Sequence, residues 1–283
     1  INNLKTLSKK FLSFLKKMDI FKKYAINFKR YLIDISLLAL FIFIKKSNNF
    51  GFTILTGSDS THFSSLLNLL NSLTTLESKT TIKIINLGMD KNEIELLQKI
   101  YNYEIVNFSF QDYPPFVSER DQFNKLGSYA WKPVSIRNEF KASNNNVIWL
   151  DAGCVITKGL NKIKILITKN GFYSPESSDQ VKKWTHPETI KKMNMPKSVL
   201  NKRNISGGIV GFSQTNPRSV KMLEEWYSNS IIKEVIAPEG SSRLNHRQDQ
   251  AILTLLMHKY KLSWSTLRTH KMFGILKHQD VDN

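Results

Sequence analysis

The alternation of short apolar runs with amphipathic helical patterns is the feature that most constrains how this chain can fold. Strand-length runs at 52–59, 81–87 and 104–110 are separated by helical patterns at 63–76 and from 90 to about 101. The second helical pattern begins with Asp90-Lys91-Asn92-Glu93, a capping-box sequence that starts a helix. Strands that alternate with helices along a chain predict an α/β fold, with a mostly parallel sheet flanked by helices.

The rest of the chain continues this alternation less regularly, after a loop at 111–122. The expected elements are a helix from about 128 to 141, strands at 147–150, 171–175 and 204–212, a broken helix at 180–193, a helix at 217–231 and another that opens within 245–250. There is no internal repeat and no low-complexity linker. We therefore expect one domain of catalytic size at 50–283, preceded by a separate segment at 1–49.

The strand at 147–150 ends abruptly on a carboxylate, Asp151, which two small residues follow. Ligands of open α/β sheets bind in the crevice beyond the carboxyl ends of the strands. Asp151 is therefore a candidate to contact a ligand or a metal ion. The alternative is that Asp151 only caps the turn after the strand.

Charge and cysteine content limit the classes of partner. The formal net charge of +18 calls for an anionic partner, which is nucleic acid, membrane lipid or a phosphorylated substrate. The one cysteine, Cys154, excludes an internal disulfide and fits a reducing compartment. No Cys/His cluster in the sequence suggests a zinc site.

The segment at 1–49 predicts a basic amphipathic helix. Between residues 4 and 32, apolar residues recur at steps of three and four, and lysines fill the positions between them. This pattern fits a helix that lies on an anionic membrane surface, although a helix docked on the core of the domain is the alternative. The apolar stretch at 31–44 would be about 21 Å long as a helix, short of the roughly 30 Å hydrocarbon core. We expect no transmembrane span and no signal peptide, and a cytoplasmic protein peripheral at a membrane, or one in the Golgi lumen if the source is eukaryotic.

Five motifs in a fixed order give the sequence a family resemblance. They are Thr56-Gly57-Ser58 at the end of the first strand, Tyr129-Ala130-Trp131-Lys132-Pro133, Asp151 after the central strand, Gly207-Gly208, and His246-Arg247-Gln248-Asp249-Gln250 at the start of a helix. From about residue 52 to its end, the chain resembles the GT-A nucleotide-sugar glycosyltransferases, above all the family 8-like group and its uncharacterised relatives. The resemblance implies a Rossmann-like GT-A fold and sugar transfer.

The resemblance also implies the residues that hold the donor. A sugar nucleotide carries a diphosphate, whose charge has to be met by cations, backbone N–H groups or a metal. The donor-binding residues that follow from the motifs are Thr56, Gly57, Ser58, Lys132, Asp151, Gly153, Gly207 and Gly208. Lys132 would pair with phosphate, and Gly207-Gly208 would let the backbone approach the substrates closely. The alternatives are a solvated lysine and a bulge that serves tight packing.

A divalent metal, Mn²⁺ or Mg²⁺, is implied less directly. In the family the central strand ends in Asp-x-Asp, whose carboxylates touch the ribose and the metal, but Gly153 replaces the second Asp here. The metal would then be held by Asp151 together with a histidine near the end of the chain, His278 or His270. The alternative is an enzyme that needs no metal.

Asp249 resembles the acidic position that lies beneath the acceptor in the family. A carboxylate there would remove the proton of the acceptor hydroxyl during inverting transfer. Its alternative role is to satisfy the dipole at the start of a helix. His246 and Arg247 beside it would contact acceptor or phosphate, or only cap the helix.

The resemblance thus implies a transferase of the hexosyltransferase type, with Mn²⁺ or Mg²⁺ as its cofactor or with none, and the basic segment at 1–49 predicts association with a membrane. The transferase would move a sugar from a nucleotide-sugar donor to a hydroxyl of a glycan or lipid-linked acceptor, in polysaccharide or glycoconjugate synthesis. One alternative is a GT-A-like binding subunit that has lost catalysis, which Gly153 motivates. The other is a basic nucleic-acid-binding protein. Residues 1–30 hold nine basic residues and one acid, so the rest of the chain keeps a charge of +10 without a recognisable reading motif, and we expect no specific nucleic-acid partner.

Overall fold

The computed structural model describes residues 51–283, apart from 122, 123, 125, 263–269 and 283, together with Phe28 and Leu32. The expected attachment segment at 1–49 thus lies outside the described residues, except for Phe28 and Leu32. The described domain belongs to one compact unit, Asn49–Asn283. No helix among the described residues is both long and apolar enough to cross a lipid bilayer.

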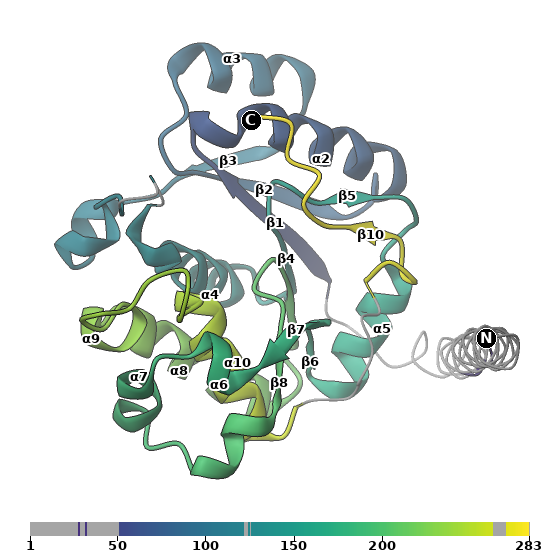
Figure 1. Cartoon of the computed structure of the whole chain (residues 1–283). Coiled ribbons are helices and arrows are strands. Elements are labelled where there is room, and N and C mark those ends of the chain that lie inside the picture. The colour runs from purple at the N-terminus through teal and green to yellow at the C-terminus, as the bar shows by residue number, and fades with distance from the viewer. Residues whose placement is uncertain are drawn as a thin grey trace, which may run out of the picture. The chain divides into compact units, whose positions relative to one another are not determined.

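A six-stranded sheet in the order β3-β2-β1-β4-β9-β6 forms the centre of the domain (Figure 1). Its strands are β1 (Phe52–Ser58), β2 (Thr81–Asn86), β3 (Glu104–Asn107), β4 (Asn146–Leu150), β6 (Phe172–Tyr173) and β9 (Ile209–Phe212). The first four are parallel, and β9 runs antiparallel to both β4 and β6. This confirms the predicted mostly parallel α/β sheet.

The burial of β4 explains why its sequence is apolar without alternation. All five residues of β4 are buried, since helices cover both of its faces. Figure 1 shows α2 (Phe63–Leu76) and α3 (Lys91–Ile100) on one side of the sheet, with α4 (Trp131–Ser143), α8 (Pro217–Ser230) and α10 (Gln248–Tyr260) on the other. Trp149, Phe212 and Trp226 are among the largest fully buried side chains of the core between them.

Local sequence signals account for the ends of several helices. α2 turns its buried leucines, Leu66, Leu69, Leu70 and Leu73, toward the sheet at steps of three and four. α3 begins with the predicted capping box, in which Asp90 accepts from the Glu93 N–H and Glu93 accepts from the Asp90 N–H. Asn216 caps α8 with its side-chain oxygen. These elements lie where the sequence predicts them.

The prediction of one strand at 204–212 is wrong. The chain instead forms β8 (Arg203–Ile205), which pairs with β7 (Glu176–Gln180) in a two-stranded sheet, and then β9 in the central sheet. The chain leaves one sheet and enters the other at Ser206-Gly207-Gly208. Polar and glycine residues weaken strand pairing there, and the hydrophobic pattern does not reveal the change of sheet.

Two further boundaries differ from the prediction. The strand expected at 104–110 ends at Asn107, and Phe110–Asp112 is a 3-10 turn. The helix expected from about 128 begins at Trp131, because Ser128 and Tyr129 have φ angles of 50° and 63° and belong to a 3-10 turn. Left-handed backbone at non-glycine residues is uncommon and stops a helix from extending backward.

The remaining elements are short. They are β5 (Val155–Ile156), which pairs antiparallel with β10 (Ile275–Leu276), the helices α5 (Asn161–Asn170), α6 (Val181–Trp184), α7 (Pro187–Lys192) and α9 (Lys233–Ile236), and 3-10 turns at Ser60–His62, Pro115–Val117 and Lys197–Asn201. The β5–β10 pair ties the last part of the chain to the loop that follows Asp151. Figure 1 shows this last part, in yellow, passing β5 and ending beside α2.

Candidate active site

A cavity of about 660 Å³ lies beyond the carboxyl ends of β1 and β4, where the start of α10 also reaches. This is the place where open α/β sheets bind ligands. The structure brings ten of the predicted site residues to its wall, namely Gly57, Ser58, Lys132, Asp151, Gly153, Gly207, Gly208, Arg247, Asp249 and His278. Residues from six separate parts of the sequence thus meet at one cavity.

Three predicted site residues lie outside the wall of this cavity: Thr56, His246 and His270 are all buried elsewhere. The His246 ring accepts from the His186 N–H at 3.1 Å and donates to the Ile236 carbonyl at 2.9 Å. Burial lowers the pKa of His246 to about 4, so its ring is neutral and joins two loops. Of the two histidines predicted to hold a metal, only His278 reaches the cavity.

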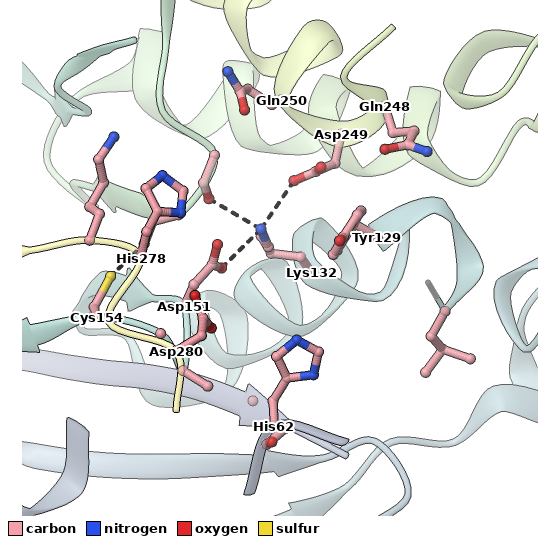
Figure 2. A pocket seen from close by; sticks show the side chains of 18 of the residues that line it. His62, Tyr129, Lys132, Asp151, Cys154, Gln248, Asp249, Gln250, His278 and Asp280 are labelled. Carbon is pink, nitrogen blue, oxygen red and sulfur yellow. Dashed lines mark hydrogen bonds and ion pairs between the residues drawn. The ribbon is translucent and has the colours of Figure 1, made fainter. Parts of the chain in front are cut away.

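Lys132 is the centre of the cavity wall (Figure 2). Its ammonium lies 3.0 Å from Asp151 Oδ1 and 3.4 Å from Asp249 Oδ2, and it donates to the Gly207 carbonyl at 3.3 Å. The side chain is almost fully buried, which lowers the pKa of a lysine, but the two carboxylates outweigh burial and hold the Lys132 pKa above its usual value. Two carboxylates thus share the charge of Lys132, and its pairing with phosphate stays a prediction.

Asp151 is fixed by its neighbours and still reaches the cavity. Its Oδ1 accepts from Trp149 Nε1 at 2.6 Å as well as from Lys132. Its own N–H donates to the Gly208 carbonyl at 2.9 Å. The side chain keeps 42% of its surface exposed. The arrangement presents one oriented carboxylate to whatever occupies the cavity.

Asp249 is the second carboxylate and is far more buried, with 4% of its surface exposed. It lies in the first turn of α10, and its own carbonyl accepts from Trp226 Nε1 at 2.9 Å. Burial raises the pKa of Asp249 to about 6, because it outweighs the opposing effect of Lys132, and the charge of Asp151 adds to the rise. A carboxylate with such a pKa is suited to accept a proton near neutral pH.

The Gly207-Gly208 pair makes room for both carboxylates. A Cβ atom on Gly208 would lie 2.6 Å from Asp151 Oδ2 and 3.1 Å from its Cγ. A Cβ on Gly207 would lie 3.4 Å from Asp249 Oδ2 and 3.1 Å from the Cβ of Gln250. Neither glycine has a positive φ angle, so the site requires glycine here because a side chain would not fit. The glycines thus serve close approach, to the Asp151 carboxylate at Gly208 and to Gln250 and Asp249 at Gly207.

Several cavity residues were missed by sequence reasoning, among them Arg120, Tyr129, Arg243, Gln250 and Asp280. Arg120 pairs with Asp59 at 2.6 Å, and the Tyr129 ring lies 5.3 Å from the Lys132 ammonium. Tyr129 and Gln250 belong to the recognised motifs but carried no charge that marked them. Arg243 and Asp280 lie in loops without a periodic pattern, so the sequence offered no signal for them.

The space around Gly153 indicates whether the cavity residues suit a divalent metal. A Cβ on Gly153 would lie 2.7 Å from Asp280 Cγ and 2.8 Å from its Oδ2, and closer still to Oδ1. A carboxylate thus fills the space of the side chain that residue 153 lacks. Carboxylate oxygens suit Mg²⁺ and Mn²⁺, so the donor set fits such an ion. Within the described ranges, however, no three His, Cys, Asp or Glu side chains lie close enough together to hold a metal without further ligands.

No protein-family model matches the sequence, and no curated protein matches it. Among solved structures, core-mannan synthase A (CmsA, also Ktr4) from Aspergillus fumigatus, in a form with Mn and GDP, is similar with a TM-score of 0.51 and 10% identity over 75% of this chain and 70% of that one. The galactosyltransferase LgtC in complex with donor and acceptor sugar analogues has a TM-score of 0.47 and 16% identity, over 72% and 70% of the chains. Mouse xyloside xylosyltransferase 1 has a TM-score of 0.44 and 11% identity, over 77% and 84%.

The similarity to CmsA carries the conclusion about the fold. It spans 75% of this chain and 70% of that one. The described domain has the GT-A fold of the nucleotide-sugar glycosyltransferases.

Proposed function

We propose that the protein is a glycosyltransferase that moves a sugar from a nucleotide-sugar donor to a hydroxyl of a glycan or lipid-linked acceptor. The observation that carries the proposal is the triad of Lys132, Asp151 and Asp249 at the carboxyl end of a GT-A sheet. One carboxylate is exposed and oriented, and the other is buried with a raised pKa. Donor binding and proton removal need these two different environments.

Asp151 is the group that we assign to the donor. It follows β4 directly and turns an exposed carboxylate into the cavity, beside Gly57 and Ser58 at the end of β1. A carboxylate accepts hydrogen bonds from ribose hydroxyls and binds divalent cations. Of the similar structures, CmsA was solved in a form with Mn and GDP, which supports a nucleotide as a ligand of this chain.

The diphosphate needs positive charge, and Arg243 and Arg247 provide it at the cavity wall. Arg247 Cζ lies 4.1 Å from the centre of the Trp184 ring. Burial and the charge of Arg243 both lower the pKa of Arg247, so the two guanidinium groups repel each other across a short distance. Within the described part of the chain neither pairs with a carboxylate. A bound phosphate would relieve the repulsion and accept hydrogen bonds from both groups.

A divalent ion, Mn²⁺ or Mg²⁺, is part of the proposal. When bound, such an ion neutralises charge on the diphosphate that leaves the sugar. Asp151 would hold it from the protein side, with His278 nearby on the cavity wall.

We assign Asp249 as the base that receives the proton of the acceptor hydroxyl, with inversion at the sugar. Its carboxylate lies at the cavity, and its pKa of about 6 leaves it ionised at neutral pH. Lys132 steadies the negative charge before transfer, and it also steadies Asp151.

Attachment to an anionic membrane would bring this site to lipid-linked acceptors, in surface polysaccharide or glycoconjugate synthesis. Phe28 and Leu32, four residues apart, are helical with 64% and 50% of their surface exposed. Two exposed apolar residues within a lysine-rich stretch of sequence suit a peripheral position at the cytoplasmic face, or in the Golgi lumen if the source is eukaryotic.

The test is a screen of nucleotide sugars for thermal stabilisation of the whole chain, with and without manganese. At least one donor should raise the melting temperature of the wild type, as expected of a ligand that binds only the folded state. Asp151→Asn should remove this shift, and its unliganded melting temperature should lie below that of the wild type, because the buried Lys132 loses one of its two carboxylate partners. Glu95→Gln, which removes an exposed carboxylate on α3, is the matched control and should keep the shift.

Donor turnover then separates the proposal from its nearest alternative. Hydrolysis or transfer of the stabilising donor would establish catalysis. Binding without any turnover, across a range of acceptors, would instead support a binding subunit that has lost catalysis, for which Gly153 is the motivating residue. The proposal would be contradicted if no nucleotide sugar raised the melting temperature of the wild type.

A further inference from the structure

Gly153 has no carboxylate to offer, but the carboxylate of Asp280 lies directly beside it. The Asp280 carboxylate fills the volume into which a side chain at residue 153 would extend, with its Cγ and Oδ2 within 2.8 Å of the position of a Cβ. Gly153 lies two residues after Asp151, so the space that Asp280 fills adjoins Asp151. Figure 2 shows Asp151 and Asp280 on the same wall of the cavity.

The segment that carries Asp280 is held on both sides. Before it, β10 pairs with β5, and the Gln279 N–H donates to the Gly153 carbonyl at 2.9 Å. After it, the Asp282 carboxylate accepts from the N–H groups of Ser64 and Ser65 at 2.7 and 2.9 Å, at the start of α2. These contacts place Asp280 beside Gly153 by main-chain geometry.

The surroundings leave Asp280 available for a ligand. Its side chain is exposed, and no described cation or hydrogen-bond donor pairs with it.

We propose that Asp280 replaces the second carboxylate of the Asp-x-Asp pattern and holds a divalent cation together with Asp151. This inference rests on the proposed function. Two carboxylates and a substrate diphosphate are a usual ligand set for Mg²⁺ and Mn²⁺ in enzymes that act on phosphates. The described side chains alone form no group of three metal ligands, so the diphosphate would have to supply the remaining ligands. The cation therefore binds more tightly when a nucleoside diphosphate is present.

The test measures Mn²⁺ binding to the whole chain by the electron paramagnetic resonance signal of free Mn²⁺, with no nucleotide and with UDP or GDP. Wild type should bind Mn²⁺, and more tightly with one of the nucleotides. Asp280→Asn should weaken this binding by roughly 100-fold or more, since loss of a mere outer-shell partner already costs about 10–100-fold. Glu95→Gln should bind Mn²⁺ as the wild type does.

A reciprocal pair of variants tests the replacement itself. Gly153→Asp should weaken Mn²⁺ binding, because its side chain would overlap Asp280. Asp280→Gly should weaken it as well, and the double variant Gly153→Asp/Asp280→Gly should bind within a few-fold of wild type. Melting temperatures show that each variant folds, and nucleotide-induced shifts without metal show that the cavity is intact.

Each other outcome counts against the inference. Unchanged Mn²⁺ affinity in Asp280→Asn, no Mn²⁺ binding by wild type with either nucleotide, or a double variant as weak as the single ones would overturn it. If the wild type still binds and turns over a nucleotide sugar, only the role of Asp280 fails. If no nucleotide sugar binds while Mn²⁺ binding depends on Asp280, the proposed function fails and the cation site stands.

Discussion

At the scale of single residues, the site depends on one buried cation. Lys132 lies in the first turn of α4, where the helix dipole disfavours a positive charge, and it is almost fully buried. Asp151 and Asp249 offset both costs. Removing one partner of a buried ion pair costs about 3–5 kcal/mol, because a charge is left unpaired. Lys132 therefore fixes the distance between the carboxylates, and the arginines of the cavity remain for phosphate.

The first residue-scale prediction concerns Asp249→Asn. The amide keeps the shape but accepts no proton, so transfer should fall by about 10²–10⁴-fold while donor binding stays near that of the wild type. Because burial raises the pKa of Asp249 to about 6, wild-type turnover should increase as pH rises through about 6, where the carboxyl loses its proton. Initial rates from pH 5 to 8 measure this limb.

The configuration of the product, determined by NMR, is the companion measurement. A base that activates the acceptor directly predicts a product anomer opposite to that of the donor. Retention of configuration, or near-normal turnover by Asp249→Asn, would show that the base assignment is wrong. The assignment of sugar transfer would survive either result, because it rests on the fold and on the donor side of the cavity.

The predictability of the site differs from residue to residue. Asp151 follows from a buried strand that ends on a carboxylate, a pattern visible in nine consecutive residues. The partners of Lys132 do not follow from sequence, because Asp151 and Asp249 come from segments far apart in the chain. Asp280 was missed for a related reason. It is an exposed acid in an irregular segment, and only the structure shows that its carboxylate lies beside Gly153.

At the scale of elements, the break between β8 and β9 shapes the cavity. The chain passes from a two-stranded sheet to the central sheet at Gly207-Gly208, and both carbonyls are used: Gly207 accepts from Lys132 and Gly208 accepts from the Asp151 N–H. A continuous strand would not place these carbonyls and the space above them next to the carboxylates. The interruption of the strand is thus part of the site.

The element-scale prediction compares two alanine substitutions in this break. Gly208→Ala places a Cβ 2.6 Å from Asp151 Oδ2, so that the carboxylate has to move, and donor affinity should fall nearly as far as in Asp151→Asn. In Gly207→Ala the nearest atoms are 3.1 and 3.4 Å away, so a small adjustment suffices and most affinity should remain. Calorimetric titration of the donor measures both. Equal affinity in the two variants would mean that the glycines do not act by making room for Asp151.

Elements with strong hydrophobic periodicity were predictable, and irregular ones were not. The bounds of α2 and β1 follow from their apolar patterns, and Asp90 marks the start of α3. The start of α4 was missed because Ser128 and Tyr129 adopt left-handed backbone, which neither residue type signals. Non-glycine residues in strained backbone cluster at functional sites, and Tyr129, Gln248 and His278 all line the cavity.

At the scale of the whole molecule, positive charge is concentrated in two places, in residues 1–30 and at the cavity. Residues 1–30 carry a net charge of +8, because this lysine-rich stretch contains nine basic residues and one acid. In the described domain, by contrast, the cavity places Arg120, Arg243, Arg247 and Lys277 among carboxylates at one end of the sheet. The first distribution suits a broad anionic surface, and the second suits a compact anion such as a diphosphate.

The prediction at this scale is that the full chain binds vesicles containing anionic lipid and that a chain of residues 50–283 does not. The binding should weaken as salt rises, because screening shortens the Debye length from about 10 Å at 0.1 M to about 3 Å at 1 M. Phe28→Ser/Leu32→Ser should also weaken it, since these exposed side chains would enter the lipid interface.

Co-sedimentation with anionic and with neutral vesicles measures both effects. A mobility shift with generic DNA or RNA is the control for unspecific attraction of a basic protein. Equal vesicle binding by the 50–283 chain would locate the attraction in the domain itself and reject an attachment role for the first 49 residues, whereas tighter binding to nucleic acid than to vesicles would favour a nucleic-acid partner.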